Sequence, residues 1–242
     1  MKLYIKKIWK LFSKVGLRLY TKNSSLYIYN NPNFTDLKNR GAYSQFGQDL
    51  FVLDTLKDVQ NGVFIDVGGN DPIKGSNTYL LEQKGWTGIA IEPQEKLRKL
   101  WPEARKTECL NYVVGPENKT ISFIEGSNDE HGLSGVEGYN KCQDNSKKIW
   151  VEQKRLTDIL KEKDINHVDY LSIDVEGYEM NVLESIDFPT SDIRLISIEN
   201  DIGFIHIPLI GKKIGRETIL NILNFLEYEV ISSDEKGAEI SV

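Results

Sequence analysis

Residues 62–77 read GVFIDVGGNDPIKGSN. The stretch opens with an apolar run rich in β-branched residues, which is typical of a strand buried on both faces of a parallel sheet. The run ends in the glycine pair 68–69, and Ser76 or Asn77 can cap the helix expected over residues 78–84. A strand, a glycine turn and a helix form a common place for nucleotide binding in α/β folds, at the carboxyl end of the strands. The stretch therefore predicts an α/β nucleotide-binding site.

The next expected strand, GIAIEP at residues 88–93, narrows the type of ligand. Glu92 ends its apolar run at about the distance beyond the glycines at which an acidic residue meets ribose hydroxyls in dinucleotide folds. The third glycine of the dinucleotide fingerprint is missing, because residues 70–73 read NDPI. Without it, close packing of helix on strand under a pyrophosphate is disfavoured. A nucleoside ligand without phosphate fits better, and S-adenosylmethionine is the common one.

Six segments of the chain resemble the FkbM family of S-adenosylmethionine-dependent methyltransferases. They are YSQFGQDLFV (43–52), FIDVGGNDP (64–72), SNTYLLE (76–82), GIAIEP (88–93), HGLSG (131–135) and LSIDVEGYEMNVLESI (171–186). The segments occur in the family's order and span roughly residues 43–200. Gly69 stands where many members carry a small residue such as alanine. The resemblance implies a methyltransferase that uses S-adenosylmethionine.

The expected fold class is α/β, as a Rossmann-like methyltransferase fold with a mostly parallel seven-stranded sheet, an antiparallel C-terminal strand and an N-terminal helical appendage. The seven core strands are expected near residues 63–67, 88–91, 108–114, 168–175, 193–198, 228–232 and 238–242, with short additional strands near 120–124 and 149–153. The short connection at residues 234–237 predicts a hairpin, which makes the ending antiparallel. We expect an appendage over residues 1–40 and a methyltransferase domain over residues 41–242.

The length and composition of the chain exclude some classes of function. A chain of 242 residues suits one α/β domain with an appendage. The net charge of −6 argues against a general nucleic-acid-binding protein. Cys109 and Cys142 have no metal-site spacing and do not indicate a disulfide framework, which fits a reducing cytoplasm. We therefore expect a cytoplasmic protein that does not bind nucleic acid.

The first 22 residues carry seven basic residues and no acidic one. On a helical wheel, Ile5, Trp9 and Phe12 fall on one face and the lysines on the other. Lysines interrupt the apolar residues too often for a spanning helix or a signal-peptide core. A basic amphipathic helix with Trp and Phe is typical of peripheral contact with an anionic membrane, here its inner face. The alternative is packing on its own domain or on a second subunit of a homodimer.

The residues expected to contact the cofactor precede the first strand, lie within it, or follow the first, second and fourth strands. They are Gln45, Asp66, Gly68, Gly69, Asn70, Asn77, Glu92, Pro93 and Asp174. The glycines suit this role because no Cβ separates their backbone from a ligand. The resemblance implies that segment 43–59, expected to be helical, folds over the methionine end of the cofactor. Capping of that helix by Ser44, Gln45 and Gln48 is the alternative interpretation.

An alcohol acceptor must lose its proton during methyl transfer, and the sequence offers more than one means. His131, in the glycine-rich loop 125–148 that we interpret as a lid, or His206 can act as a general base. His131 as a surface imidazole without a catalytic task is the alternative. Asp174 and Glu199, which end the fourth and fifth core strands, can instead hold Mg²⁺ or Mn²⁺ through oxygen ligands. Asp174 itself is a third candidate base.

The function expected is O-methyl transfer from S-adenosylmethionine to a hydroxyl of a glycan, a glycolipid or a secondary metabolite. The acceptor class follows from the family resemblance alone. A nucleotide-dependent oxidoreductase is the alternative enzyme, disfavoured by the missing third glycine and by the antiparallel ending. A non-catalytic module that binds the cofactor or a glycan within a membrane-associated assembly complex is the alternative of another class.

Overall fold

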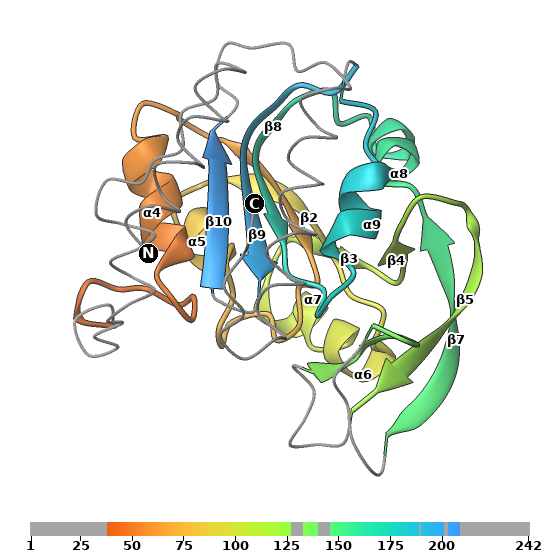
Figure 1. Cartoon of the computed structure of the whole chain (residues 1–242). Helices are drawn as coiled ribbons and strands as arrows, with labels where there is room; N and C mark the ends of the chain where they lie inside the picture. Colours follow the sequence, from red (N-terminus) through yellow and green to blue (C-terminus); the bar gives the residue numbers. More distant parts are fainter. Residues whose placement is uncertain (1–37, 127–132, 140–145, 189, 201–202, 209–242) are drawn as a thin grey trace, which may run out of the picture.

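The computed structural model describes residues 38–126, 133–139, 146–188, 190–200 and 203–208 (Figure 1). The helix expected over residues 1–22 and the two strands expected beyond residue 227 lie outside these residues, so the seven-strand count stays a prediction. Within the described ranges, no helix has both the length and the hydrophobicity needed to cross a lipid bilayer.

Six strands form the main sheet, in the order β10-β9-β8-β1-β2-β3. Their bounds are Val63–Val67 for β1, Thr87–Ile91 for β2, Glu108–Leu110 for β3, Val168–Ile173 for β8, Ile193–Asn200 for β9 and Gly203–Pro208 for β10. All neighbouring pairs are parallel except β9 and β10, which are antiparallel. The predicted α/β fold with a mostly parallel sheet is confirmed. Strand β10 is an addition, because the sequence pattern does not predict a strand at residues 203–208.

Helices cover both faces of the main sheet, which explains why β8 is buried at every position (Figure 1). Helices α8 (Leu156–Glu162) and α9 (Glu179–Glu184) pack on one face, against apolar side chains that include Ile65, Leu171 and Ile196. Helices α4 (Gln48–Thr55) and α5 (Tyr79–Gln83) pack on the other, against Phe64, Tyr170 and Leu195. Successive residues of one strand therefore belong to different cores, as the strand period of two requires.

The strand order reverses between β1 and β8. From β1 the chain moves outward to β2 and β3, and it later returns to the other side of β1 to add β8 and β9. The connections that follow β1 and β8 leave the sheet in opposite directions, which opens a crevice at the carboxyl ends of these two strands. The fold thus places a potential ligand site beside Gly68 and Asp174, the residues that follow β1 and β8.

A second sheet of four strands, in the order β4-β7-β5-β6, is drawn in green on the right of Figure 1. Its strands are β4 (Val113–Val114), β5 (Lys119–Glu125), β6 (Gly135–Val136) and β7 (Lys147–Lys154). The prediction of a single strand at residues 108–114 is wrong, because β3 ends at Leu110 and β4 belongs to the second sheet. Asn111 marks the break: its Nδ2 donates to the carbonyl oxygens of Glu92 (3.2 Å) and Pro93 (2.9 Å).

Candidate active site

A cavity of about 870 Å³ opens at the carboxyl edge of the main sheet and extends to the second sheet. Its wall contains all of the predicted cofactor residues, namely Gln45, Asp66, Gly68, Gly69, Asn70, Asn77, Glu92, Pro93 and Asp174, together with Glu199. The volume lies in the range of small-molecule and cofactor sites, roughly 300–1,000 Å³. Residues that are far apart in sequence thus share one cavity of suitable size.

The glycine turn after β1 is shaped by its neighbours in the protein. Gly68 has a φ of +85°, and its N–H and that of Gly69 both donate to the carbonyl oxygen of Ile91, at 3.0 and 3.1 Å. A Cβ at position 68 would overlap the main-chain oxygen of Asp174, and one at position 69 would lie 2.8 Å from the Trp101 ring. Position 68 therefore requires glycine because β8 ends against it, whatever ligand the cavity holds.

Glu92 is buried, with 3% of its surface exposed, and it contributes to the cavity wall. Its Oε2 accepts the N–H of Asn70 at 2.9 Å, and its Oε1 accepts the N–H of Gln94 at 2.7 Å. Burial raises the pKa of the Glu92 carboxyl to about 7, and these hydrogen bonds oppose the rise. A carboxylate has about four lone-pair sites, so it can accept further hydrogen bonds from ligand hydroxyls.

Asp66 precedes the glycine turn and Asn77 follows it, and both are buried at the cavity wall. The Thr78 hydroxyl donates to Asp66 Oδ2 at 2.6 Å, and Asn77 Nδ2 donates to the Ser172 hydroxyl at 3.0 Å. Burial raises the pKa of the Asp66 carboxyl, while Thr78 and the nearby positive charge of Arg105 lower it. Both side chains are thus held in place at the cavity wall by other residues.

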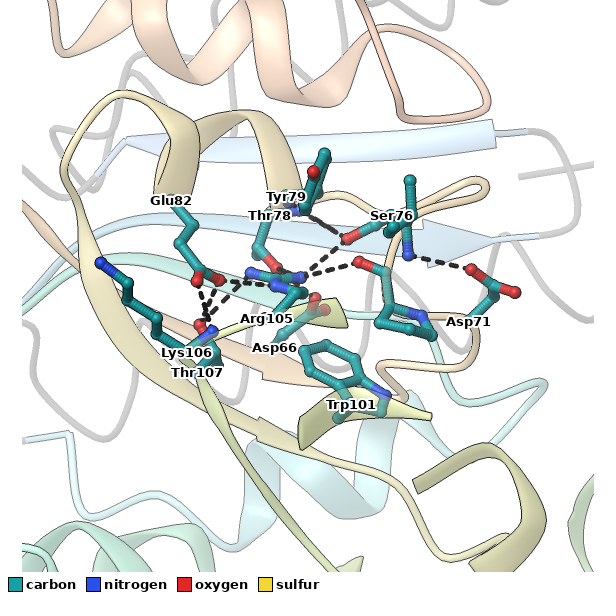
Figure 2. Close-up of polar contacts among 12 residues, drawn as sticks. Asp66, Asp71, Ser76, Thr78, Tyr79, Glu82, Trp101, Arg105, Lys106 and Thr107 are labelled. Atoms are coloured by element: carbon teal, nitrogen blue, oxygen red, sulfur yellow. Dashed lines mark hydrogen bonds and ion pairs between the residues drawn. The ribbon is translucent and has the colours of Figure 1, made fainter. Parts of the chain in front are cut away.

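Arg105 is not among the predicted site residues, and its side chain is fully buried. Figure 2 shows its guanidinium between Glu82 on one side and the segment after the glycine turn on the other. Nε donates to Glu82 Oε2 at 2.6 Å, and one terminal nitrogen donates to the hydroxyls of Ser76 and Thr78, both at 3.1 Å. The guanidinium also lies over the Trp101 ring, 4.6 Å from its centroid. Arg105 therefore holds the loop that forms one wall of the cavity.

The segment before α4 lies on the cavity in a shape set by Asp49, which is fully buried. Asp49 Oδ1 accepts the Ser44 hydroxyl at 2.6 Å, and Oδ2 accepts the Ser44 N–H at 3.2 Å. Ser44 also forms an isolated parallel bridge with Gly75, beyond the glycine turn. These contacts place the exposed Gln45 at the cavity. The helix is shorter than the predicted 43–59, because residues 43–47 form this turn and α4 already ends at Thr55.

Three carboxylates meet where β8 and β9 end. Asp174, Glu176 and Glu199 each offer one oxygen, and these oxygens lie within 4.8 Å of one another. Burial and the neighbouring Glu199 carboxylate raise the pKa of Asp174 well above its ordinary value. Three carboxylates at such distances repel unless a proton or a cation is shared among them. The group adds Glu176, which has a φ of +55°, to the predicted pair Asp174 and Glu199.

Comparison with known proteins identifies the family. A family model described as the methyltransferase FkbM domain matches residues 66–232, which is more than half of the chain. The chain belongs to the FkbM methyltransferase family. The resemblance seen in the six sequence segments is thereby confirmed, and the chain contains a methyltransferase FkbM domain.

This FkbM methyltransferase is also similar to a solved structure described as the crystal structure of AibC. The sequences are 14% identical, the match covers 74% of this chain and 40% of that chain, and the TM-score is 0.36. The FkbM methyltransferase thus spans less than half the length of that protein. A search of curated proteins found no match.

The matched FkbM region begins at Asp66 and includes the glycine turn, Glu92 and the three carboxylates, whereas Gln45 precedes it. His131, the predicted base, lies outside the described residues, and His206 lies in β10 as the register partner of Ser197. Glu176 belongs to the quoted segment LSIDVEGYEMNVLESI, so its nearness to Asp174 in sequence was an available signal. No pattern in the sequence marks Arg105, whose partners include Thr78, Glu82 and Thr107.

Proposed function

We propose that this FkbM methyltransferase takes its methyl group from S-adenosylmethionine and transfers it to a hydroxyl of a glycan, a glycolipid or a secondary metabolite. The observation that carries the proposal is the buried Glu92 carboxylate at the cavity wall, next to the glycine turn. A carboxylate at the end of the second strand suits ribose hydroxyls, which donate hydrogen bonds to it. The acceptor class rests on the family resemblance.

The residues of the cavity fit this cofactor. Glu92 keeps acceptor capacity beyond the two N–H groups that it already binds. Gln45, Asp66 and Asn77 supply amide and carboxyl groups suited to the amino and carboxylate ends of methionine. When bound, S-adenosylmethionine supplies the methyl group for transfer.

The chain's own task is to hold the acceptor hydroxyl in line and to remove its proton. Asp174 lies at the cavity, and burial beside Glu199 raises the pKa of its carboxyl, which makes its carboxylate a stronger base than an exposed one. We propose Asp174 as the residue that receives the proton or that binds a cation which acidifies the hydroxyl. His131 remains the alternative base.

Replacing Glu92 with alanine tests the cofactor assignment. We expect the affinity for S-adenosylhomocysteine to fall by about 1.5–3 kcal/mol, as for a lost charged hydrogen bond. Titration calorimetry measures it, with exposed Glu95→Ala as the control. The 2′-deoxy analogue of the ligand separates direct from indirect effects, because the variant should not distinguish it from the parent ligand.

Two results would contradict this assignment. If Glu92→Ala still prefers the parent ligand over its 2′-deoxy analogue as strongly as the original protein does, the carboxylate does not bind the 2′-hydroxyl. If NAD raises the melting temperature of the original protein and S-adenosylhomocysteine does not, the oxidoreductase alternative is favoured, since a ligand that binds the native state stabilises it.

We further propose that Asp174, Glu176 and Glu199 bind Mg²⁺ or Mn²⁺. The three groups supply only oxygen ligands, which these hard cations prefer, and a cation would relieve their mutual repulsion. A bound cation next to the acceptor hydroxyl would lower the pKa of that hydroxyl.

A chelator should then abolish transfer of tritium from labelled S-adenosylmethionine to cell-envelope glycans, and Mg²⁺ or Mn²⁺ should restore it. Loss of the free Mn²⁺ signal in electron paramagnetic resonance measures cation binding without any acceptor. Asp174→Asn and Glu199→Gln should abolish that binding, and the exposed Glu184→Gln should preserve it. Activity that survives chelation but is lost in His131→Ala would identify the histidine as the base instead.

A further inference from the structure

The lining of the cavity has two chemically different halves, which the sheet order places on either side of β2, the strand that Glu92 follows: β1 and β8 lie on one side, and β3, which leads to the second sheet, lies on the other. One half is polar and contains Gln45, Asp66, Asn77 and Asp174. The other half is mainly apolar and contains Leu97, Val113, Val114, Phe123 and Val136. Most of the apolar half comes from the second sheet, which lies outside the parallel main sheet.

The hairpin of β5 and β6 supplies the far wall of the apolar half. Phe123 on β5 is the register partner of Val136 on β6, and both contribute to the cavity wall. Ser134, just before β6, accepts the N–H of Gly126 at 2.8 Å and donates to Gln94 Oε1 at 3.1 Å. The N–H of Gln94 in turn donates to Glu92, so hydrogen bonds connect the hairpin to this carboxylate through Gln94.

The division of the cavity fixes how a nucleoside cofactor can lie in it. If the ribose hydroxyls bind Glu92, the base and the 5′ substituent extend away from Glu92 in different directions, because they are attached to C1′ and C4′ at the two ends of the ribose. The 5′ substituent of S-adenosylmethionine carries an ammonium, a carboxylate and a sulfonium, and burying such charges among apolar side chains is strongly unfavourable. The purine is flat and weakly polar, and aromatic side chains stack on such bases.

We propose that the β5–β6 hairpin forms the pocket for the purine base, with Phe123 contacting the base and the Ser134–Gln94 hydrogen bond holding the hairpin beside the ribose. This inference rests on the proposed cofactor. It assigns a binding role to the second sheet and directs the methionine portion towards Gln45, Asp66 and Asn77.

Two ligands and two variants test this orientation. S-adenosylhomocysteine carries the base, the ribose and an amino acid, whereas 5′-methylthioadenosine carries the base and the ribose without the amino acid. Phe123→Ala should weaken both ligands by the same factor, about tenfold or more. Gln45→Ala, at an exposed position, should weaken S-adenosylhomocysteine and leave 5′-methylthioadenosine unchanged. Calorimetry measures all four affinities.

Ile121→Ala is the matched control, because Ile121 lies two residues before Phe123 on β5, is buried in the same apolar cluster and does not line the cavity. It should bind both ligands as the original protein does. Phe123→Leu keeps most of the side-chain volume and should also weaken both ligands, which covers the case in which Phe123→Ala does not fold.

The proposal is overturned if the Phe123 variants bind both ligands as tightly as Ile121→Ala does. It is equally overturned if the Phe123 variants weaken only S-adenosylhomocysteine, which would place the amino acid in the apolar half. Failure of the proposed cofactor itself is a different result, because the original protein would then bind neither ligand.

Discussion

Arg105→Met lowers the free energy of unfolding by about 3–5 kcal/mol, the range measured when one partner of a buried ion pair is removed. Its guanidinium is fully buried and binds Glu82, Ser76 and Thr78. Methionine fills a similar volume but leaves Glu82 and the nearby Asp66 without their positive partner. Urea denaturation followed by circular dichroism measures the change.

Arg194→Met is the matched control for this prediction. Arg194 donates to Asp169 Oδ1 at 3.0 Å, but 42% of its side chain is exposed, so we expect a loss of about 1 kcal/mol or less. Arg105→Lys keeps the charge without the planar group that reaches several partners, and should fall between the two. Equal losses for Arg105→Met and Arg194→Met would show that the network around Arg105 is not required for stability.

Gly68→Ala should destabilise the protein by about 3 kcal/mol or more, because a left-handed backbone conformation and an overlap with main-chain atoms act together. The sequence predicted that Gly68 lacks a side chain so that a ligand can approach its backbone. In the structure, the main-chain oxygen of Asp174 lies where a Cβ at position 68 would be. The free energy of unfolding is therefore expected to change even without any cofactor, as urea denaturation would show.

Gly75→Ala separates the two contributions. Gly75 also has a positive φ, +76°, but nothing lies within 4 Å of the position that its Cβ would take. Only the conformational strain of about 1–2 kcal/mol should then appear. If Gly68→Ala is no more destabilising than Gly75→Ala, then β1 and β8 separate easily at this point.

The parts of the fold that the sequence predicted correctly depend on local patterns. Strands β1, β2, β8 and β9 are short apolar runs, and each ends in polar or glycine residues. Because parallel strands end at one edge, the sequence predicts that Glu92, Asp174 and Glu199 lie at the same edge of the sheet. Their presence in one cavity agrees with that reasoning.

The parts that the sequence did not predict depend on contacts between distant segments. Residues 108–114 have one continuous pattern, yet the chain changes sheet where Asn111 binds carbonyl groups at the end of β2. The residues next to Arg105 in the sequence do not distinguish it from a surface arginine. Only the fold brings Glu82 and Thr78 to it. Periodicity reports which face of an element is apolar, and it carries no information on such pairings.

The contact between Gly68 and the main chain of Asp174 also bears on protein engineering. No side chain separates the two strand ends there, so substitutions in β1 or β8 cannot adjust their spacing in small steps. The β5–β6 hairpin and the turn at residues 43–47 reach the same cavity from outside the parallel sheet. Libraries or chimaeras intended to change ligand range are therefore best confined to these two segments, since they leave the spacing of the strand ends untouched.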